Sequence, residues 1–328
     1  MKKLINHPDY VVQEMIEGMA LAHPQIIRKL NDTNILVRTD LNNAKVALVS
    51  GGGSGHEPAH GGFVGTGMLD AAVAGEVFTS PTPDQILEAI KAVDRGKGVL
   101  LIIKNYSGDV MNFEMAMELA EAEGILVEKV VVDDDVAVKN STYTVGRRGI
   151  AGTIFVHKIA GALAEQGASL DEVKQIADRV ILQTKSMGMA LSSCIIPAVG
   201  KPGFELPEDE MEMGMGIHGE PGIERKKVVS ADEVASVLVS HLQKEMPLAA
   251  NDRVAVMVNG LGATPMMELY IVSRKVSQLL QESKIQVHRT FVGEYMTSLE
   301  MAGCSVTFLK LDNVLAELLD QPAQTIAW

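Results

Sequence analysis

Three short segments of the chain carry residues suited to acid–base or nucleophilic chemistry. Residues 50–62 surround His56, residues 103–109 end on Asp109, and residues 214–222 surround His218. Each segment places glycine near the reactive group, and glycine lets a backbone turn tightly or lets a ligand lie close to it. These three segments are the candidate functional sites.

The first segment reads Ser-Gly-Gly-Gly-Ser-Gly-His-Glu-Pro from residue 50 and follows an apolar run typical of a buried strand. Open α/β sheets bind ligands at the carboxyl ends of their strands. The segment lacks the Lys and Ser/Thr that close a P-loop, and His56 replaces the last glycine of a dinucleotide-binding motif, so nucleotide binding is not supported. His56 is either a loop histidine tied to backbone or a hydrogen-bonding group for a substrate.

Residues 56–60 also match the H-E-x-x-H pattern of zinc proteases. That motif needs both histidines on one face of a regular helix. Pro58 falls within the turn that would join them, and proline is tolerated only in the first turn of a helix. We therefore expect no zinc site here, and we expect a structural role for His60.

The second segment places a carboxylate where a strand-like run turns into a helix near Met111. Asp109 is either the N-cap of that helix or a general base at the same sheet edge as His56. Lys104 either donates to a polar substrate or reaches solvent from the strand end. Ser80, which follows another strand-like run, either donates to a substrate or acts as a cap.

The third segment surrounds His218 with glycines, which leaves its ring accessible. An imidazole can attack a carbonyl carbon as a nucleophile, and glycine neighbours permit this sterically. The alternative is a mobile surface loop without a function.

Two charged runs are weaker candidates. Residues 133–135 are three adjacent aspartates, but hard cations draw ligands from a more spread arrangement, so we expect these carboxylates mostly to face water. Arg147 and Arg148 precede a helix and either grip a phosphate or a partner's acidic face, or form a solvated surface pair.

Strands and helices alternate around these segments. Residues 45–50, 99–104 and 125–132 are typical of buried strands because they are rich in Val, Ile and Leu. A capping box at Thr82 begins a helix that ends near Asp94, and residues 111–122 repeat apolar positions at helical spacing. This order predicts β-α-β units and a mostly parallel sheet.

The second half repeats the α/β character. Capping boxes at Ser169 and Ser230 begin two more helices, and a helix is predicted over 265–282. Strands are predicted over 254–258, 285–291 and 305–310. At 328 residues the chain exceeds one ordinary core. We predict two α/β domains, residues 1–187 with a mostly parallel sheet flanked by helices, and residues 188–328.

Composition excludes several classes of protein. The formal net charge is −13 and the longest basic run is only Arg225 to Lys227, which argues against a nucleic-acid partner. No run approaches the roughly 18 apolar residues that span a bilayer, and no leader pattern is present, so we expect no membrane association and a cytoplasmic location. Cys194 and Cys304 lie in apolar stretches and are expected to be buried thiols.

Together, five motifs in register resemble the dihydroxyacetone-binding K subunits of dihydroxyacetone kinases, and the similarity runs from Met1 to Trp328. The motifs are Gly-Gly-Gly-Ser-Gly-His-Glu-Pro from residue 51, Phe-Thr-Ser-Pro from 78, Lys-Asn-Tyr-Ser-Gly-Asp from 104, Val-Asp-Asp-Asp from 132 and Gly-Ile-His-Gly-Glu-Pro-Gly from 216.

The resemblance implies a role for each candidate residue. It implies that His218 forms a hemiaminal with the ketone, that Asp109 accepts the hydroxyl proton and that His56 hydrogen-bonds the substrate. It further implies that Gly53, Ser80 and Lys104 line the same pocket. A covalent bond through a carbonyl selects ketones and aldehydes over polyols, because an alcohol offers imidazole no carbon to attack.

The resemblance also implies an assembly. The chain would be a homodimeric phosphotransferase subunit that binds no cofactor itself. A partner L subunit would carry ADP or ATP with Mg²⁺, and an M subunit would supply phosphate from phosphoenolpyruvate. Two alternatives remain: a K-like paralogue that binds dihydroxyacetone as coactivator of a transcription regulator, and a lipid carrier on a related fold, which would need a long apolar pocket.

Overall fold

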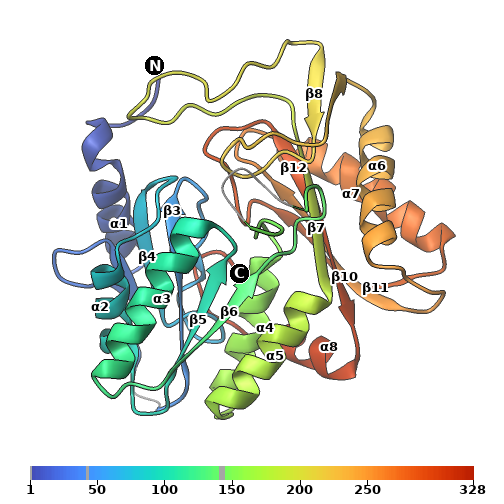
Figure 1. Ribbon diagram of the computed structural model, residues 1–328. Helices are drawn as coiled ribbons and strands as arrows, with labels where there is room; N and C mark the ends of the chain where they lie inside the picture. Colours follow the sequence, from blue (N-terminus) through green and yellow to red (C-terminus); the bar gives the residue numbers. More distant parts are fainter. Residues whose placement is uncertain (1, 42–43, 140–144) are drawn as a thin grey trace.

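The protein is built on two six-stranded sheets with helices between and around them (Figure 1). The computed structural model describes residues 2–41, 44–139 and 145–328. This architecture confirms the predicted α/β class with two sheet-centred halves.

The first sheet has the order β1-β2-β4-β3-β5-β6. Strands β4, β3, β5 and β6 run parallel, whereas β1 and β2 join antiparallel at one edge, so the sheet is mostly parallel as predicted. Its strands are β1 (Ile27–Lys29), β2 (Ile35–Arg38), β3 (Ala47–Ser54), β4 (Ala71–Val77), β5 (Val99–Lys104) and β6 (Val127–Val132).

Helices cover both faces of this sheet, which is why its strands are apolar on both sides. On β5, Leu101 and Ile103 pack with Phe113 of α3, whereas Leu100 and Ile102 pack with Ile154 of α4. The helices of this half are α1 (Val11–Ala22), α2 (Pro83–Val93), α3 (Ser107–Ala122), α4 (Thr153–Glu165) and α5 (Leu170–Leu182).

The second sheet has the order β11-β10-β12-β7-β8-β9, in which only β10 and β11 pair in parallel. Its strands are β7 (Thr184–Ala190), β8 (Glu210–Met213), β9 (Glu224–Lys227), β10 (Arg253–Gly260), β11 (Gln286–Gly293) and β12 (Gly303–Leu311). Its helices are α6 (Ala231–Glu245), α7 (Met266–Glu282) and α8 (Asn313–Asp320).

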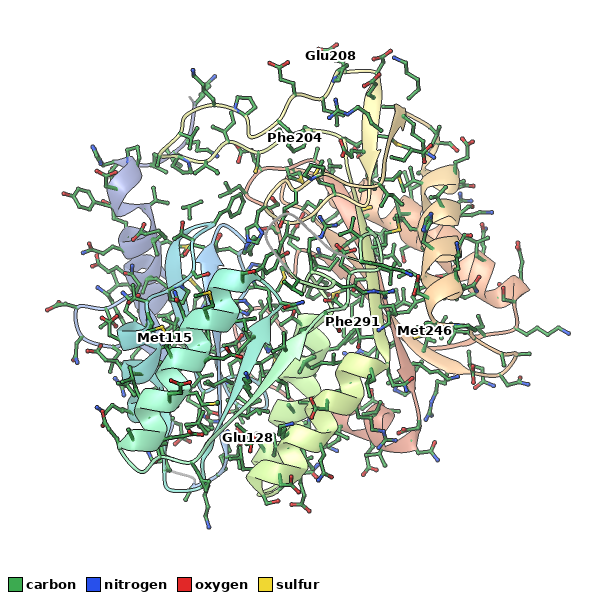
Figure 2. The ribbon with its side chains drawn as sticks, in the orientation of Figure 1. Met115, Glu128, Phe204, Glu208, Met246 and Phe291 are labelled. Carbon is green, nitrogen blue, oxygen red and sulfur yellow. The ribbon has the colours of Figure 1, made fainter. Side chains whose placement is uncertain are left out.

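Helix α4 lies in the layer that joins the two sheets. It is buried along nearly its whole length. Residues of α4 share one core with Leu100 of the first sheet and with Met257 and Leu309 of the second. Phe155 of α4 meets Phe291 of β11 with 5.7 Å between ring centroids, and Figure 2 shows Phe291 among the side chains in this region. The two sheets therefore share one apolar core.

The predicted boundary between residues 187 and 188 falls inside β7, whose seven residues all pair with β12 of the second sheet. The boundary stays a prediction, because the sheets alone do not delimit independently folding units. All three predicted capping boxes are present, at Thr82, Ser169 and Ser230. In the part of the chain that the structure describes, no helix is long and apolar enough to cross a membrane.

Candidate functional site

The carboxyl ends of β3, β4 and β5 bring the first group of predicted residues together. Gly53 lies on β3, Ser80 follows β4, Lys104 ends β5 and Asp109 lies in the first turn of α3. Parallel neighbouring strands end at one sheet edge, so these side chains meet there. His218 reaches the same place from the loop between β8 and β9 of the second sheet.

These residues surround an open pocket of about 280 Å³. Its wall is formed by Gly53, Phe78, Ser80, Tyr106, Ser107, Gly108, Asp109, Ile196, His218 and Glu220. Four of the six predicted site residues therefore line the pocket directly. His56 and Lys104 are fully buried behind it and reach it through His218 and Asp109.

His218 is held on three sides. Its Nε2 lies 3.0 Å from His56 Nε2, and its Nδ1 lies 2.9 Å from Glu220 Oε1. The rings of Phe78 and Tyr106 stand edge-on to the imidazole, with centroids 5.1 and 4.6 Å away. The side chain keeps 18% of its surface exposed, on the pocket side. These contacts hold the imidazole in place, which argues against a mobile surface loop, and a role for His218 in chemistry stays a prediction.

The protonation of His56 follows from its neighbours. Its Nδ1 lies 2.8 Å from the Thr297 carbonyl oxygen, which can only accept, so Nδ1 carries a proton and a neutral His56 presents a lone pair at Nε2. Burial holds the pKa of His56 well below its usual value, and the positive charges of Lys104 and His218 lower it further. The two Nε2 atoms lie within hydrogen-bond distance, so one proton lies between them.

Glu220 supplies the charge that balances this proton. Burial raises the pKa of the Glu220 carboxyl, but His218 and the Arg148 guanidinium lower it more, to about 2. Glu220 is thus a carboxylate at neutral pH. Its Oε2 also accepts the backbone N–H of His218 at 2.8 Å, which fixes the loop against the carboxylate.

Asp109 faces the pocket and not its own helix. The N-cap of α3 is Tyr106, so the hypothesis that Asp109 is the cap is wrong: the helix begins at Ser107, earlier than predicted. Ser80 Oγ donates to Asp109 Oδ1 at 2.5 Å. Ser80 lines the pocket, but its hydroxyl donates to Asp109, so donation from Ser80 to a substrate stays a prediction.

Lys104 does not reach solvent, which corrects the strand-end alternative. Its Nζ is fully buried, lies 3.8 Å from Asp109 Oδ2 and has no hydrogen-bond partner within the described residues. Burial lowers the pKa of Lys104, and the carboxylates of Asp109 and Glu220 oppose this. Gly52 leaves room for the pair, because a Cβ there would lie 3.1 Å from Lys104 Nζ and 3.2 Å from Asp109 Oδ2.

The two histidines of the H-E-x-x-H pattern diverge. Residues 55–60 form turns and not a helix, as Pro58 predicted. His60 turns away from His56 and contacts His157 at 3.0 Å between His60 Nδ1 and His157 Nε2, in a fully buried position. Across the described ranges, no group of three or more His, Cys, Asp or Glu residues is arranged to hold a metal ion. Metal independence stays a prediction.

The structure corrects two further expectations, one for the aspartates at 133–135 and one for Arg147 and Arg148. Asp134 and Asp135 do not face water: Asp134 accepts the N–H groups of Ile150 and Gly152, and Asp135 binds Arg148. Arg148 is likewise fully buried, whereas Arg147 pairs with Glu245 near the surface at 2.7 Å.

Several residues of the site escaped the sequence analysis. Glu220 stands two positions from His218, and that spacing of a carboxylate and a histidine was a usable signal. Thr297 and Ile196 gave none, because they reach the site only through the fold.

A family described as the Dak1 domain matches residues 17–327. The chain belongs to the Dak1 family. Its relatives include the dihydroxyacetone-binding subunit of PTS-dependent dihydroxyacetone kinase 1 of Listeria innocua, which is 56% identical over 100% of both chains. Another is the corresponding subunit of the PEP-dependent kinase of Escherichia coli, 46% identical over 100% of this chain and 99% of that protein.

Solved structures extend the comparison of this Dak1 chain. A dihydroxyacetone kinase operon co-activator superposes with a TM-score of 0.90 at 41% identity, covering 96% of this chain and 97% of the other. The dihydroxyacetone kinase of C. freundii gives a TM-score of 0.92 at 39% identity, covering all of this chain and 60% of the other. The Dak1 fold thus occurs both in kinases and in a co-activator.

Proposed function

We propose that this Dak1 chain is the dihydroxyacetone-binding subunit of a phosphoenolpyruvate-dependent dihydroxyacetone kinase and holds the ketone as a hemiaminal on His218. The observation that carries the proposal is the arrangement of His218 between His56 and Glu220 on one wall of a pocket whose other wall bears Asp109. One wall is suited to capture a carbonyl, and the other is suited to activate a hydroxyl.

Capture begins with the proton shared by the two histidines. His218 Nε2 attacks the carbonyl carbon as the carbonyl π bond breaks and its electron pair moves to oxygen. The proton that the two histidines share is on His56 during the attack, because a protonated Nε2 has no lone pair, and it then passes to that oxygen, which becomes the hemiaminal hydroxyl. His218 keeps its Nδ1 proton, is neutral while it attacks and becomes positively charged when the Nε2–carbon bond forms, and Glu220 faces that charge from 2.9 Å.

Transfer uses the other wall. Asp109 accepts the proton of a terminal hydroxyl while that oxygen takes the phosphoryl group, since a carboxylate within hydrogen-bond reach is a suitable general base. Ser80 and Lys104 fix the carboxylate orientation through its two oxygens. The phosphoryl donor is ATP with Mg²⁺ on a partner L subunit, ADP is the leaving group, and an M subunit recharges the ADP from phosphoenolpyruvate. A homodimer and a cytoplasmic location are part of the same proposal.

The second candidate is a dihydroxyacetone-binding coactivator, which the 41% identity to an operon co-activator favours. The pairing of Asp109 with Ser80 favours the kinase subunit, because a pure sensor needs no base beside the hydroxyl. The two hypotheses agree on ketone capture and differ on phosphoryl transfer.

Two measurements test the proposal. Native mass spectrometry with dihydroxyacetone should show a gain of one triose mass on the intact chain, and glycerol should give none. Addition of purified L and M subunits with phosphoenolpyruvate should then yield dihydroxyacetone phosphate, whereas the chain with ATP and Mg²⁺ alone should yield none. Adduct without transfer would favour the coactivator, and absence of an adduct would refute covalent capture.

A further inference from the structure

The loop that carries His218 is tied to one carboxylate by two bonds. Glu220 Oε1 contacts the imidazole Nδ1 at 2.9 Å, and Oε2 accepts the backbone N–H of the same residue at 2.8 Å. A carboxylate accepts only, so this contact requires the proton on Nδ1. Nε2 is then the nitrogen that faces the pocket and His56.

A buried arginine stands behind this carboxylate. Arg148 lies in the segment before α4, and its guanidinium is fully buried. Its Nε donates to Asp135 Oδ2 at 2.8 Å, and its Nη2 donates to the Gly214 carbonyl oxygen at 2.7 Å. Arg148 therefore joins the segment after β6 to the start of the loop that carries His218.

Gly216 shows how closely the arginine and the carboxylate approach. A Cβ at Gly216 would lie 2.6 Å from Arg148 Nη1 and would also overlap Glu220 Oε2. Arg148 Nη1 has no hydrogen-bond partner among the residues that the structure describes. The distances at Gly216 place this nitrogen close to the Glu220 carboxylate. Arg148 pairs directly with Asp135, and Glu220 is a second carboxylate close to the same buried guanidinium.

We propose that Glu220 and Arg148 are positioning residues for His218: Glu220 sets the tautomer that makes Nε2 the nucleophile, and Arg148 holds Glu220 in place as a carboxylate. The inference rests on the proposed function, since it concerns the same covalent step. It adds that the nucleophile, which belongs to the second half, is oriented by the Asp135–Arg148 pair of the first half.

The positive charge of the adduct is a second reason to expect that Glu220 supports capture. An imidazole substituted at Nε2 that keeps its Nδ1 proton is a cation, so capture places a permanent charge in a mostly buried loop. Glu220 balances that charge. Orienting partners of ligating histidines typically contribute roughly 10- to 100-fold to affinity or activity.

The test compares Glu220→Gln with Glu212→Gln. Glu212 is a matched control, because it also accepts a backbone N–H in this loop, that of Gly222, and pairs with an arginine, Arg225, but does not contact His218. We expect Glu220→Gln to weaken adduct formation roughly 10- to 100-fold, and we expect Glu212→Gln to leave it within about twofold. ¹⁵N spectra of His218 should show the Nδ1–H tautomer in the wild type and Glu212→Gln, and its loss in Glu220→Gln.

A second pair of variants examines Arg148 through pH. The charged or titratable groups facing Glu220 are His218, Arg148, Lys104 and Tyr106. Burial raises the Glu220 pKa, and the guanidinium is one of the groups, after His218, that lower it. Loss of the guanidinium should therefore raise that pKa, so Arg148→Met should lose adduct at acidic pH and recover it as pH rises. Arg225→Met should show no such recovery, and Arg148→Lys should recover part of the loss at all pH values.

The outcomes separate the two proposals. A wild-type adduct with equal adduct formation and unchanged tautomer in Glu220→Gln would overturn the positioning role and leave covalent capture intact. Absence of a wild-type adduct would refute covalent capture itself. A pH-independent loss in Arg148→Met, with a folded protein by circular dichroism, would reduce Arg148 to a purely structural link and contradict the inference.

Discussion

The Nε2 atoms of His56 and His218 lie 3.0 Å apart, and only one proton can lie between them. The Thr297 carbonyl fixes the other proton of His56, and Glu220 fixes the other proton of His218. The two histidines therefore share one proton at their Nε2 atoms, and His218 Nε2, the proposed nucleophile, has a free lone pair only while that proton is on His56.

His218→Ala should abolish the adduct, because a methyl group cannot attack a carbonyl carbon. Native mass spectrometry with dihydroxyacetone measures this directly. His241→Ala on α6 serves as the control and should keep the adduct. A mass gain that persists in His218→Ala would assign the nucleophile to another residue.

Asp109→Asn should retain the adduct while lowering turnover with the L and M subunits roughly 10²- to 10⁴-fold, the range typical of a lost general base. The amide keeps the size of the carboxylate and can still accept the Ser80 hydrogen bond, but it cannot take the substrate proton. Adduct mass and product formation are measured on the same sample. Near-normal turnover would show that Asp109 only supports the pocket wall.

Gly52→Ala should disturb the Lys104–Asp109 pair. Gly52 has φ +148°, and an added methyl would crowd both side chains at 3.1 and 3.2 Å. Gly96→Ala is the matched control: Gly96 also has a positive φ, +75°, but the space around its Cβ is open. Both variants should lose about 1–3 kcal/mol of unfolding free energy from backbone strain, measured by urea denaturation. Only Gly52→Ala should also lose turnover.

His157→Gln should make the free energy of unfolding fall less steeply as the pH is lowered. Burial, together with the charge of Lys104, lowers the pKa of His157 from 6.5 to about 3. Between pH 6.5 and about pH 3, His157 is therefore protonated in the unfolded chain and neutral in the folded chain. The free energy of unfolding falls by about 1.4 kcal/mol per pH unit for such a group, until the pH reaches the folded pKa.

The measurement is urea denaturation between pH 6.5 and pH 4, comparing slopes and not absolute stabilities. The slope in His157→Gln should be smaller by the contribution of one histidine, and the exposed His7→Asn should retain the wild-type slope. His60 shares this cluster, and burial also holds its pKa well below the usual value, so part of the slope should remain. An unchanged slope would mean that His157 is charged in the folded protein.

Local patterns predicted part of the fold, and α1, α8 and the strands β1, β2, β7, β8 and β9 were not predicted. Apolar runs predicted β3, β5 and β6, because central strands of a parallel sheet are buried on both faces. The capping boxes at Thr82, Ser169 and Ser230 located three helix starts, because the cap is satisfied by residues only three positions away. Helix α3 has no side-chain cap bond, and its start was accordingly placed too late.

The sequence predicted only those site residues whose signal lies within their own short segment. Glycines beside two histidines, and a carboxylate after a strand, predicted His56, His218 and Asp109 as candidate site residues. Their roles stay predictions. Long-range partners left no such signal: the His56–Thr297 contact spans 241 positions and the Arg148–Gly214 contact spans 66. For the same reason Asp134 and Asp135 were expected in water, since the groups that they bind come from a later segment.

The two walls of the pocket are anchored on separate elements. His218 and Glu220 belong to one loop of the second sheet, whereas Asp109, Ser80 and Lys104 belong to the strand ends and helix start of the first. Under the proposed function, capture and transfer could therefore be lost independently: a few substitutions near Asp109 would leave a ketone-binding protein without transfer, and the loop carrying His218 would need no change. The same scaffold could then serve a kinase subunit or a co-activator, depending on a few side chains at one wall of the pocket.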